Sequence, residues 1–383
     1  MSDPIPFNKP FIIGKELYYI SQCVLRGQSA GDGPFTQQCQ EMIGRLLDTP
    51  HVLLTTSCTS ALHIAALLCR LEPGDEVIMP SYSGAAAASV FHGIGAKLVF
   101  VDIDPRTLTI DLDHTQRSLG AKSRAVVPRH YFGASCDMDR LQELLANTPA
   151  RVIEDVAEGF SARYGGRALG TLGDFGAFSF HESKDVTCGE GGALVLRDAV
   201  DFERAEIIRE KGTNRSQFFR GQVDKYTWVD AGSSYVPSDL LAAFLAAQLE
   251  HADEILTRKR EIYEQYAAAF EPLAETGLVR LQSIRPECRT NHHGFLILVE
   301  SEQHQAALIE HLADLGIAAV FHFTPLHESV MGRRLGYAPG DLPVTEAVSR
   351  QVVRLPFFHE LTADDVRRVA DGVYGYYSMT PPA

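Results

Sequence analysis

Lys184 is the residue of this sequence with the clearest chemical potential. It follows an apolar run, Gly176 to Phe180, that is typical of a buried strand, and it precedes a glycine-rich turn at residues 187–192. A lysine held at such a junction can be partly removed from water, which lowers its pKa and leaves the amine free to attack a carbonyl. Most lysines are solvated surface charges, so this interpretation needs support from other residues.

Asp155 ends another apolar run, which includes Val152 and Ile153. Open α/β sheets bind their ligands at the carboxyl ends of buried strands, where this carboxylate would lie. There it could keep the pyridine nitrogen of pyridoxal 5′-phosphate (PLP) protonated, so that the ring withdraws electrons. Capping of the next turn is the structural alternative for Asp155.

A stretch of small hydroxyl residues, Thr55 to Ser60, follows a third strand-like run and opens a helical pattern. The free N–H groups of such a helix start are suited to a phosphate group, although simple N-capping explains the same residues. The helix start, Asp155 and Lys184 follow one another at helix-sized spacings. Together they predict a PLP site, which none of them predicts alone.

Between residues 50 and 200, short apolar runs alternate with helical patterns. Strands buried on both faces and joined by helices form a mostly parallel sheet, so we expect an α/β fold. A long helical pattern from Ser238 to about Ala269 follows, and beyond it come a strand at 294–299, a helix at 303–315, a second strand at 318–321 and a closing helix at 362–376. We therefore expect a large α/β domain over residues 1–245 and a small α+β domain over residues 246–383.

The composition is that of an ordinary globular enzyme, with 35 basic and 49 acidic residues among 383 and a net charge of -14. This charge argues against a nucleic-acid or membrane partner. The seven cysteines are scattered without metal-binding spacing, which predicts reduced thiols and no metal. The sequence shows neither a secretion signal nor an apolar run of membrane length, so we expect a cytoplasmic protein.

Several blocks of the sequence resemble the sugar-nucleotide aminotransferases of the DegT/StrS type, which have the PLP fold type I. The blocks are Pro73 to Pro80, Ser179 to Lys184, Gly189 to Gly192 and Arg209 to Trp228. The resemblance runs from about Phe7 to Tyr377. It implies a seven-stranded, mostly parallel sheet, a homodimer with shared active sites, and transfer of an amino group from glutamate to a dTDP-linked 4-keto-6-deoxyhexose.

The resemblance also implies a role for individual residues. Lys184 would form the internal aldimine with PLP, and Asp155 would pair with the pyridine nitrogen. The other residues expected at the cofactor are Ser57, Cys58, Thr59, Gly84, Glu158, Ser179 and, from a second subunit, Ser234. The residues expected at the nucleotide sugar are His181, Arg215, His322 and His327. Structural histidines and a solvated arginine are the alternatives for this last set.

Three positions beside the expected cofactor depart from the family pattern. Gly84 stands where an aromatic residue usually stacks on the PLP ring, and Glu158 stands where glutamine usually donates a hydrogen bond to the phenolic oxygen. Arg129 replaces an apolar residue, and it could pair with Glu158 or bind an acidic substrate. These departures leave open neutral drift or a different PLP reaction, such as elimination, replacement or carbon–carbon chemistry. A non-catalytic scaffold is disfavoured because Lys184 and Asp155 are intact.

Overall fold

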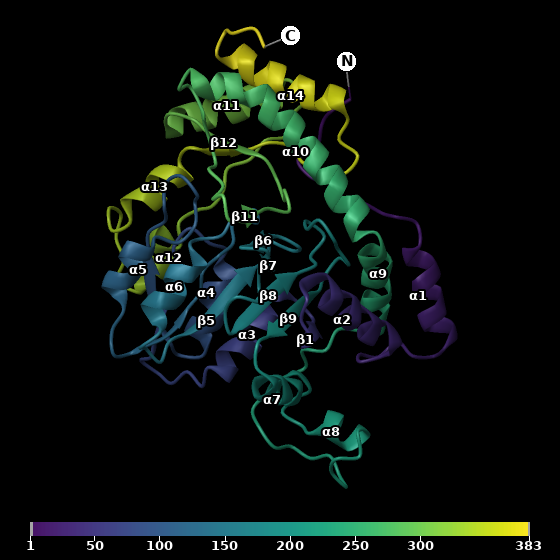
Figure 1. Ribbon diagram of the computed structural model, residues 1–383. Helices are drawn as coiled ribbons and strands as arrows, with labels where there is room; N and C mark the ends of the chain where they lie inside the picture. Colours follow the sequence, from purple (N-terminus) through teal and green to yellow (C-terminus); the bar gives the residue numbers. More distant parts are fainter. Residues whose placement is uncertain (1–2, 382–383) are drawn as a thin grey trace.

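The computed structural model describes residues 3–381, and its largest element is a seven-stranded sheet with the strand order β1-β9-β8-β5-β4-β2-β3 (Figure 1). The strands are β1 (Val52–Thr55), β2 (Glu76–Pro80), β3 (Lys97–Val101), β4 (Ser123–Val126), β5 (Arg151–Val156), β8 (Phe175–Ser179) and β9 (Gly192–Leu196). Neighbours from β3 to β8 pair in parallel, whereas β9 pairs antiparallel with both β8 and β1. The prediction of a mostly parallel sheet is confirmed.

Helices cover both faces of this sheet and give each face its own hydrophobic core. One face packs against α2 (Pro34–Leu47), α5 (Leu112–Ser118), α6 (Met138–Leu145) and α9 (Asp239–Glu250), and the other packs against α3 (Cys58–Leu68), α4 (Ala85–Gly93) and α7 (Ala199–Arg209). Successive strand residues alternate between the two cores, so that Leu53 and Leu54 lie in different ones. Burial on both faces explains why the strands read as unbroken apolar runs.

A smaller lobe packs around a separate core that includes Ile5 from the N-terminal segment. It contains α10 (Ala252–Glu275), α11 (Glu302–Asp314), α14 (Ala363–Tyr376) and an antiparallel sheet of β10 (Arg280–Leu281), β12 (Leu296–Leu298) and β13 (Val352–Arg354). Figure 1 shows this lobe above the main sheet, with α10 running into it and both chain termini beside it. A division of the chain near residue 245 stays a prediction, which the separate core supports.

Two expected elements differ from those observed. The helical pattern from Ser238 to Ala269 forms two helices, α9 and α10, because the backbone of His251 leaves helical geometry at φ -113° and ψ 17°. The strand expected at residues 318–321 does not form. Ala318 bonds to Ile5 and Val320 bonds to Arg354, so the segment never pairs twice in succession with one partner.

The remaining elements are short, apart from α1 on the outside of α9. They are α1 (Glu16–Leu25), α8 (Arg215–Phe219), η1 (Leu326–Glu328), α12 (Val330–Arg334), α13 (Pro343–Ser349), and a small sheet of β6 (Arg163–Tyr164), β7 (Arg167–Ala168) and β11 (Cys288–Arg289). The excursion around α8 projects from the main lobe (Figure 1). No helix within residues 3–381 is long and apolar enough to cross a membrane.

Candidate active site

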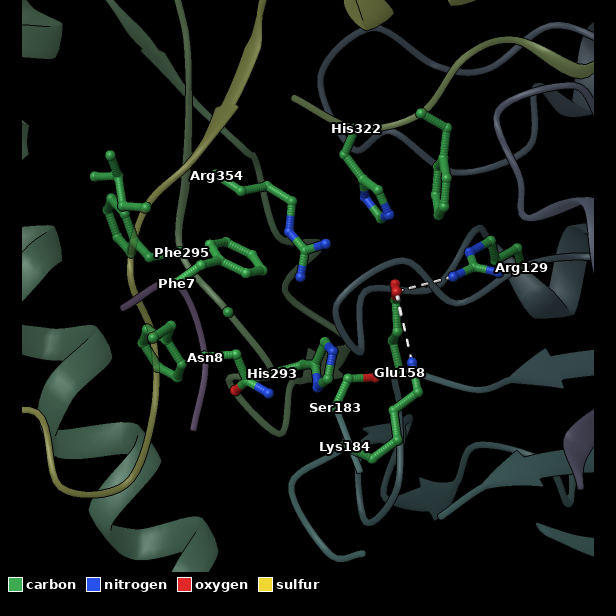
Figure 2. Close-up of a pocket in the computed structure, with 14 residues that line it drawn as sticks. Phe7, Asn8, Arg129, Glu158, Ser183, Lys184, His293, Phe295, His322 and Arg354 are labelled. Atoms are coloured by element: carbon green, nitrogen blue, oxygen red, sulfur yellow. Dashed lines mark ion pairs between the residues drawn. The ribbon is translucent and has the colours of Figure 1, made fainter. Parts of the chain in front are cut away.

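Two cavities meet at Lys184. The strand-end cavity, of about 350 Å³, lies at the carboxyl ends of β5 and β8 and is lined by Ser57, Cys58, Thr59, Gly84, Asp155, Ala157, Ser179 and His181, among others. The cleft cavity, of about 240 Å³, lies between the two lobes, and its lining includes Phe7, Glu158, His293, His322, Phe323 and Arg354 (Figure 2). Arg129, Ser183 and Lys184 line both cavities.

The start of α3 forms one end of the strand-end cavity. Ser57 caps this helix, because its Oγ accepts a hydrogen bond from the amide of Ser60 at 3.1 Å. The first-turn amides have no partner within the helix, and they carry the positive end of its dipole. Gly192 of β9 passes so close that a Cβ on it would lie 2.3 Å from the carbonyl carbon of Ser57. The backbone position of this helix start therefore depends on a glycine in the neighbouring strand.

Asp155 lies at the end of β5 and is 3% exposed. Its Oδ1 accepts a hydrogen bond from the amide of Ala157 at 3.1 Å, and its Oδ2 accepts one from Nη1 of Arg129 at 3.1 Å. The strand places this carboxylate at the floor of the strand-end cavity, as the sequence predicts.

Arg129 and Glu158 form a buried ion pair, with 2.9 Å between Nη2 and Oε1. Burial opposes the charge of Glu158, but Arg129 and Lys184 hold the pKa of its carboxyl well below the usual value. The pairing of these two departures from the family pattern, which the sequence suggested, is thus confirmed. Glu158 is ionised and can accept hydrogen bonds but cannot donate them.

Lys184 lies in a turn after β8, in which its amide donates to the carbonyl oxygen of His181 at 2.9 Å. Its side chain is 16% exposed, and its Nζ lies 3.9 Å from Oε1 of Glu158. Burial lowers the pKa of this amine, while Glu158 opposes that shift. A site that reduces the charge of a lysine in this way favours the nucleophilic free amine.

The next residue, Asp185, anchors the turn to the rest of the molecule. It lies 3.2 Å from Nζ of Lys259 on α10, and it accepts a hydrogen bond from Nδ2 of Asn291 at 2.8 Å. Nδ1 of His293 lies 3.2 Å from the same carboxylate. These contacts, all buried, tie the position of Lys184 to both lobes.

Gly84 leaves an open space beside Arg129. A Cβ on this glycine would have only one neighbour within 4 Å among the described residues, Nη1 of Arg129 at 3.9 Å. The other side of the guanidinium faces the small lobe, where the ring of Phe323 lies 4.9 Å from Cζ of Arg129. The guanidinium of Arg129 therefore borders the space that an aromatic side chain at position 84 would otherwise occupy.

Arg354, which the sequence reasoning missed, points into the cleft cavity from β13 (Figure 2). Its Cζ lies 4.9 Å from the rings of both Phe7 and Phe132. No acidic side chain within residues 3–381 forms an ion pair with it. The available signal was an arginine in an otherwise apolar run, Val352 to Leu355.

His322 also lies in the cleft cavity, where its Nδ1 is 2.8 Å from the hydroxyl of Tyr131. Burial, together with the charge of Arg354, lowers the pKa of His322 to about 2. The imidazole is therefore neutral, and Arg354 is the cation beside it that has no acidic partner among residues 3–381.

The other predicted site residues fall into two groups. Ser179 and His181 line the strand-end cavity, and Nδ1 of His181 lies 2.9 Å from Oγ of Ser183. His327 does not line either cavity. It is fully buried, with Nδ1 2.7 Å from Oγ of Ser81 and Nε2 3.0 Å from Oε1 of Glu346. Both ring nitrogens are thus engaged, so we remove His327 from the substrate-binding set and assign it to packing.

Arg215 and Ser234 also lie outside the two cavities of their own chain. Arg215 belongs to α8, where it lies 3.7 Å from Glu210 and over the ring of Phe219. Ser234 is exposed and forms a backbone bridge with Glu210.

Comparison with known proteins identifies the family of this chain. Residues 12–374 match the model of the DegT/DnrJ/EryC1/StrS aminotransferase family. The chain belongs to this family and is a PLP-dependent aminotransferase of fold type I.

Three relatives illustrate the extent of the similarity. GDP-perosamine synthase from Escherichia coli O157:H7 is 29% identical over 378 residues, which cover 98% of this chain and 99% of that protein. The aminotransferase TlmJ from Streptoalloteichus hindustanus has a TM-score of 0.89 at 28% identity, over 98% of this chain and 99% of TlmJ. DesV from S. venezuelae, crystallised with a ketimine intermediate, has a TM-score of 0.89 at 27% identity, over 99% of this chain and 100% of DesV.

Proposed function

We propose that this enzyme transfers an amino group from glutamate to the keto carbon of a dTDP-linked 4-keto-6-deoxyhexose, the reaction type of dTDP-4-amino-4,6-dideoxygalactose transaminase. The observation that carries the proposal is the position of Lys184, where a cavity with the features of a cofactor site meets a cavity with a free cation. The names of relatives such as GDP-perosamine synthase support a sugar substrate.

The strand-end cavity has the residues that PLP needs. Ser57, Cys58, Thr59 and Ser179 would hold the phosphate, and Asp155 would accept a hydrogen bond from the protonated pyridine nitrogen and keep it protonated. Small side chains at Gly84 and Ala157 leave room for a flat ring between these groups. When bound, PLP supplies an aldehyde that links to amines and a ring that stabilises negative charge on the neighbouring carbon.

Lys184 would bond to the cofactor through Nζ and, once released by a donor amine, would move protons at the reacting carbon. Its burial at the boundary of the two cavities keeps it within reach of both ligands. A positioned amine of lowered pKa is suited to such proton transfer, which contributes about 10²–10⁴-fold to rate.

Arg354 supports a donor with a carboxylate. Its guanidinium faces the cleft cavity without an acidic partner among the described residues, and the flanking rings of Phe7 and Phe132 restrict its motion. A carboxylate of glutamate could bind this fork with two hydrogen bonds. His181 lines the strand-end cavity and His322 lines the cleft cavity, and both remain proposed contacts of the sugar.

We also propose a homodimer in which Ser234 and Arg215 of one copy reach the site of the other. The excursion that bears α8 exposes large apolar side chains, since Phe219 is 68% exposed and Trp228 is 78% exposed. Such a surface is typical of one that another protein covers.

The proposed reaction is tested with the PLP-loaded enzyme in two steps. L-Glutamate alone should remove the visible absorption band and yield the amino form of the cofactor, identified by mass after release. A 4-keto-6-deoxyhexose nucleotide should then restore the band, and dTDP-linked and GDP-linked sugars should be compared. An unchanged spectrum with glutamate would contradict the proposed donor.

A different PLP reaction is the second candidate, because a buried Arg129–Glu158 ion pair and the open Gly84 face border Lys184. This candidate would be favoured if another amino acid changed the spectrum and glutamate did not. The reaction with that amino acid should then release a keto acid or form a new carbon–carbon bond.

A further inference from the structure

The two carboxylate oxygens of Glu158 differ in their contacts. Its Oε1 lies 2.9 Å from Nη2 of Arg129 and 3.9 Å from Nζ of Lys184. Its Oε2 is buried and has no hydrogen-bond partner among residues 3–381. An unpartnered carboxylate oxygen is costly in a protein interior, so a hydrogen-bond donor or positive charge placed beside Glu158 would stabilise it.

The neighbours of Glu158 and Lys184 determine which charges face the Lys184 nitrogen. Beside Lys184 lie Asp155 and the thiol of Cys58, whose pKa is raised by burial so that it stays neutral. Beside Glu158 lie His293 and His322, whose pKa values are lowered by burial so that both are neutral.

The charged groups that remain next to the Lys184 nitrogen are thus one cation and two carboxylates, Arg129 with Asp155 and Glu158. Arg354 is a further cation across the cleft, where it acts on His322. Because Asp155 is assigned to the pyridine nitrogen of PLP, Glu158 is the carboxylate that faces a positive charge on the Lys184 nitrogen, with 3.9 Å between Oε1 and Nζ.

We propose that Glu158, fixed by Arg129, is the counter-ion that holds a proton on the Lys184 nitrogen when that nitrogen is bonded to PLP. This inference rests on the proposed function in one respect, the assignment of Lys184 as the PLP-bound lysine. Arg129 is a positioning residue here, because it keeps Glu158 ionised and orients its carboxylate toward Lys184.

The proton has a chemical consequence. The carbon joined to a protonated nitrogen is a stronger electrophile, so a donor amine attacks it more readily. A neutral amide at position 158 could not act as a counter-ion, since it carries no charge. The three departures from the family pattern then form one device, in which Gly84 leaves space for Arg129 and Arg129 holds Glu158.

The experiment is a pH titration of the visible absorption band of the PLP-loaded enzyme. In Glu158→Gln, the midpoint at which the nitrogen loses its proton should fall by at least about one pH unit, the usual effect of a close opposite charge. In the double variant Arg129→Met/Glu158→Gln, the fall should be smaller, because the opposing charge of Arg129 is lost as well. The midpoint should therefore be highest in the wild type, lower in the double variant and lowest in Glu158→Gln.

Glu182→Gln is the matched control. This carboxylate lies two residues before Lys184, but it is exposed, lines neither cavity and forms no ion pair among the described residues. Its titration should follow the wild type. If Glu158→Gln does not retain PLP, the double variant, in which no unpaired charge is created at Arg129, supplies the comparison with the wild type.

Two failures can be told apart. Borohydride reduction followed by peptide mass analysis shows whether PLP is attached to Lys184 in the wild type. Attachment at Lys184 with equal midpoints in wild type and variants would overturn the counter-ion role alone. Absence of cofactor from Lys184 would overturn the proposed function, and this inference with it.

Discussion

The two cavities that meet at Lys184 are built from different parts of the chain. All residues that line the strand-end cavity lie between Ser57 and Gly191, in the main lobe. The cleft cavity combines Phe7 of the N-terminal segment, main-lobe residues such as Glu158, and small-lobe residues from His293 to Phe357. The first depends on the ends of strands in one sheet, whereas the second depends on how two lobes and a terminal segment pack.

This difference suggests where the enzyme's chemistry and its specificity reside. A site at the ends of adjacent strands is held by backbone hydrogen bonds, so its geometry follows from the sheet. A site between lobes changes with every side chain along the boundary, and such clefts commonly bind variable ligands. We expect substitutions in the strand-end cavity to weaken cofactor binding. Substitutions in the cleft cavity should instead change which substrates the enzyme accepts.

Lys184→Ala should have the largest effect, because Lys184 serves both cavities. Turnover should fall by at least about 10³-fold, in line with the loss of a positioned proton-transfer group. Rates with glutamate and a keto-sugar nucleotide measure the loss, and borohydride reduction followed by mass analysis should find no cofactor attached to the chain. Lys122→Ala, which changes an exposed lysine, is the control and should leave both measurements unchanged. Cofactor that remains covalently attached in Lys184→Ala would refute the assignment.

Arg354→Met should separate the cleft cavity from the strand-end cavity. The KM for glutamate should rise about 100-fold, since hydrogen bonds to charged groups contribute about 1.5–3 kcal/mol and each tenfold corresponds to about 1.4 kcal/mol. The visible band of the PLP-loaded enzyme should persist. Arg354→Lys keeps the charge without the planar fork and should recover part of the loss. A weakened cofactor affinity with an unchanged KM would show that the two cavities are not independent.

Asp185→Asn should test the buried contacts that connect the Lys184 turn to the small lobe. Burial opposes the charge of Asp185, but the hydrogen bond from His293 and the charge of Lys259 lower its pKa from the ordinary 3.8 to about 2. A depressed pKa stabilises the fold above the ordinary value, and this stabilisation is lost as the pH falls from about 4 through about 2. The variant should therefore be about 2 kcal/mol less stable at pH 7, because one pKa unit corresponds to about 1.4 kcal/mol.

Urea unfolding at pH 7 and at pH 3 measures this difference. The difference in free energy of unfolding between the wild type and Asp185→Asn should be large at pH 7 and smaller at pH 3. Asp364→Asn is the control, because the side chain of Asp364 is 81% exposed, and it should change stability little. A gap that does not vary with pH would place the stabilisation in packing rather than in charge.

Gly192→Ala should have the smallest effect and should act on the strand-end cavity alone. The added Cβ would displace the start of α3, and such overpacking costs about 1–3 kcal/mol. We expect the Kd for PLP to rise about tenfold, measured by fluorescence titration of the cofactor-free enzyme. The KM for glutamate at saturating PLP should not change. Gly93→Ala lies on α4 with no neighbour within 4 Å among the described residues, so it should leave the Kd unaltered.

Much of the main lobe and of the strand-end cavity was predictable from local patterns. The strands near Ile78, Val99 and Ile153 have apolar runs because they are buried on both faces, and Asp155 and Lys184 stand where such runs end. The small lobe was less predictable. Segment 318–321 has the composition of a strand, but its hydrogen bonds are divided between Ile5 and Arg354, which are distant in sequence.

The cleft cavity shows the same limit at the level of single residues. His322 and His327 stand five residues apart and looked equivalent, yet one lines the cavity and the other is enclosed by Ser81 and Glu346. Arg354 was overlooked because its surroundings, Phe7 and Phe132, come from other parts of the chain. Its lack of an acidic partner could be recognised only when the neighbours were known.

The sequence by itself determined the parallel sheet, the helix start at Ser57 and the order of Asp155 and Lys184, because these depend on periodicity and on strand ends that local residues specify. Only the tertiary structure decided that Arg129 pairs with both Asp155 and Glu158, and that Arg354 faces the cleft. These arrangements depend on long-range packing, in which a side chain's charge and exposure are set by residues far away in the chain.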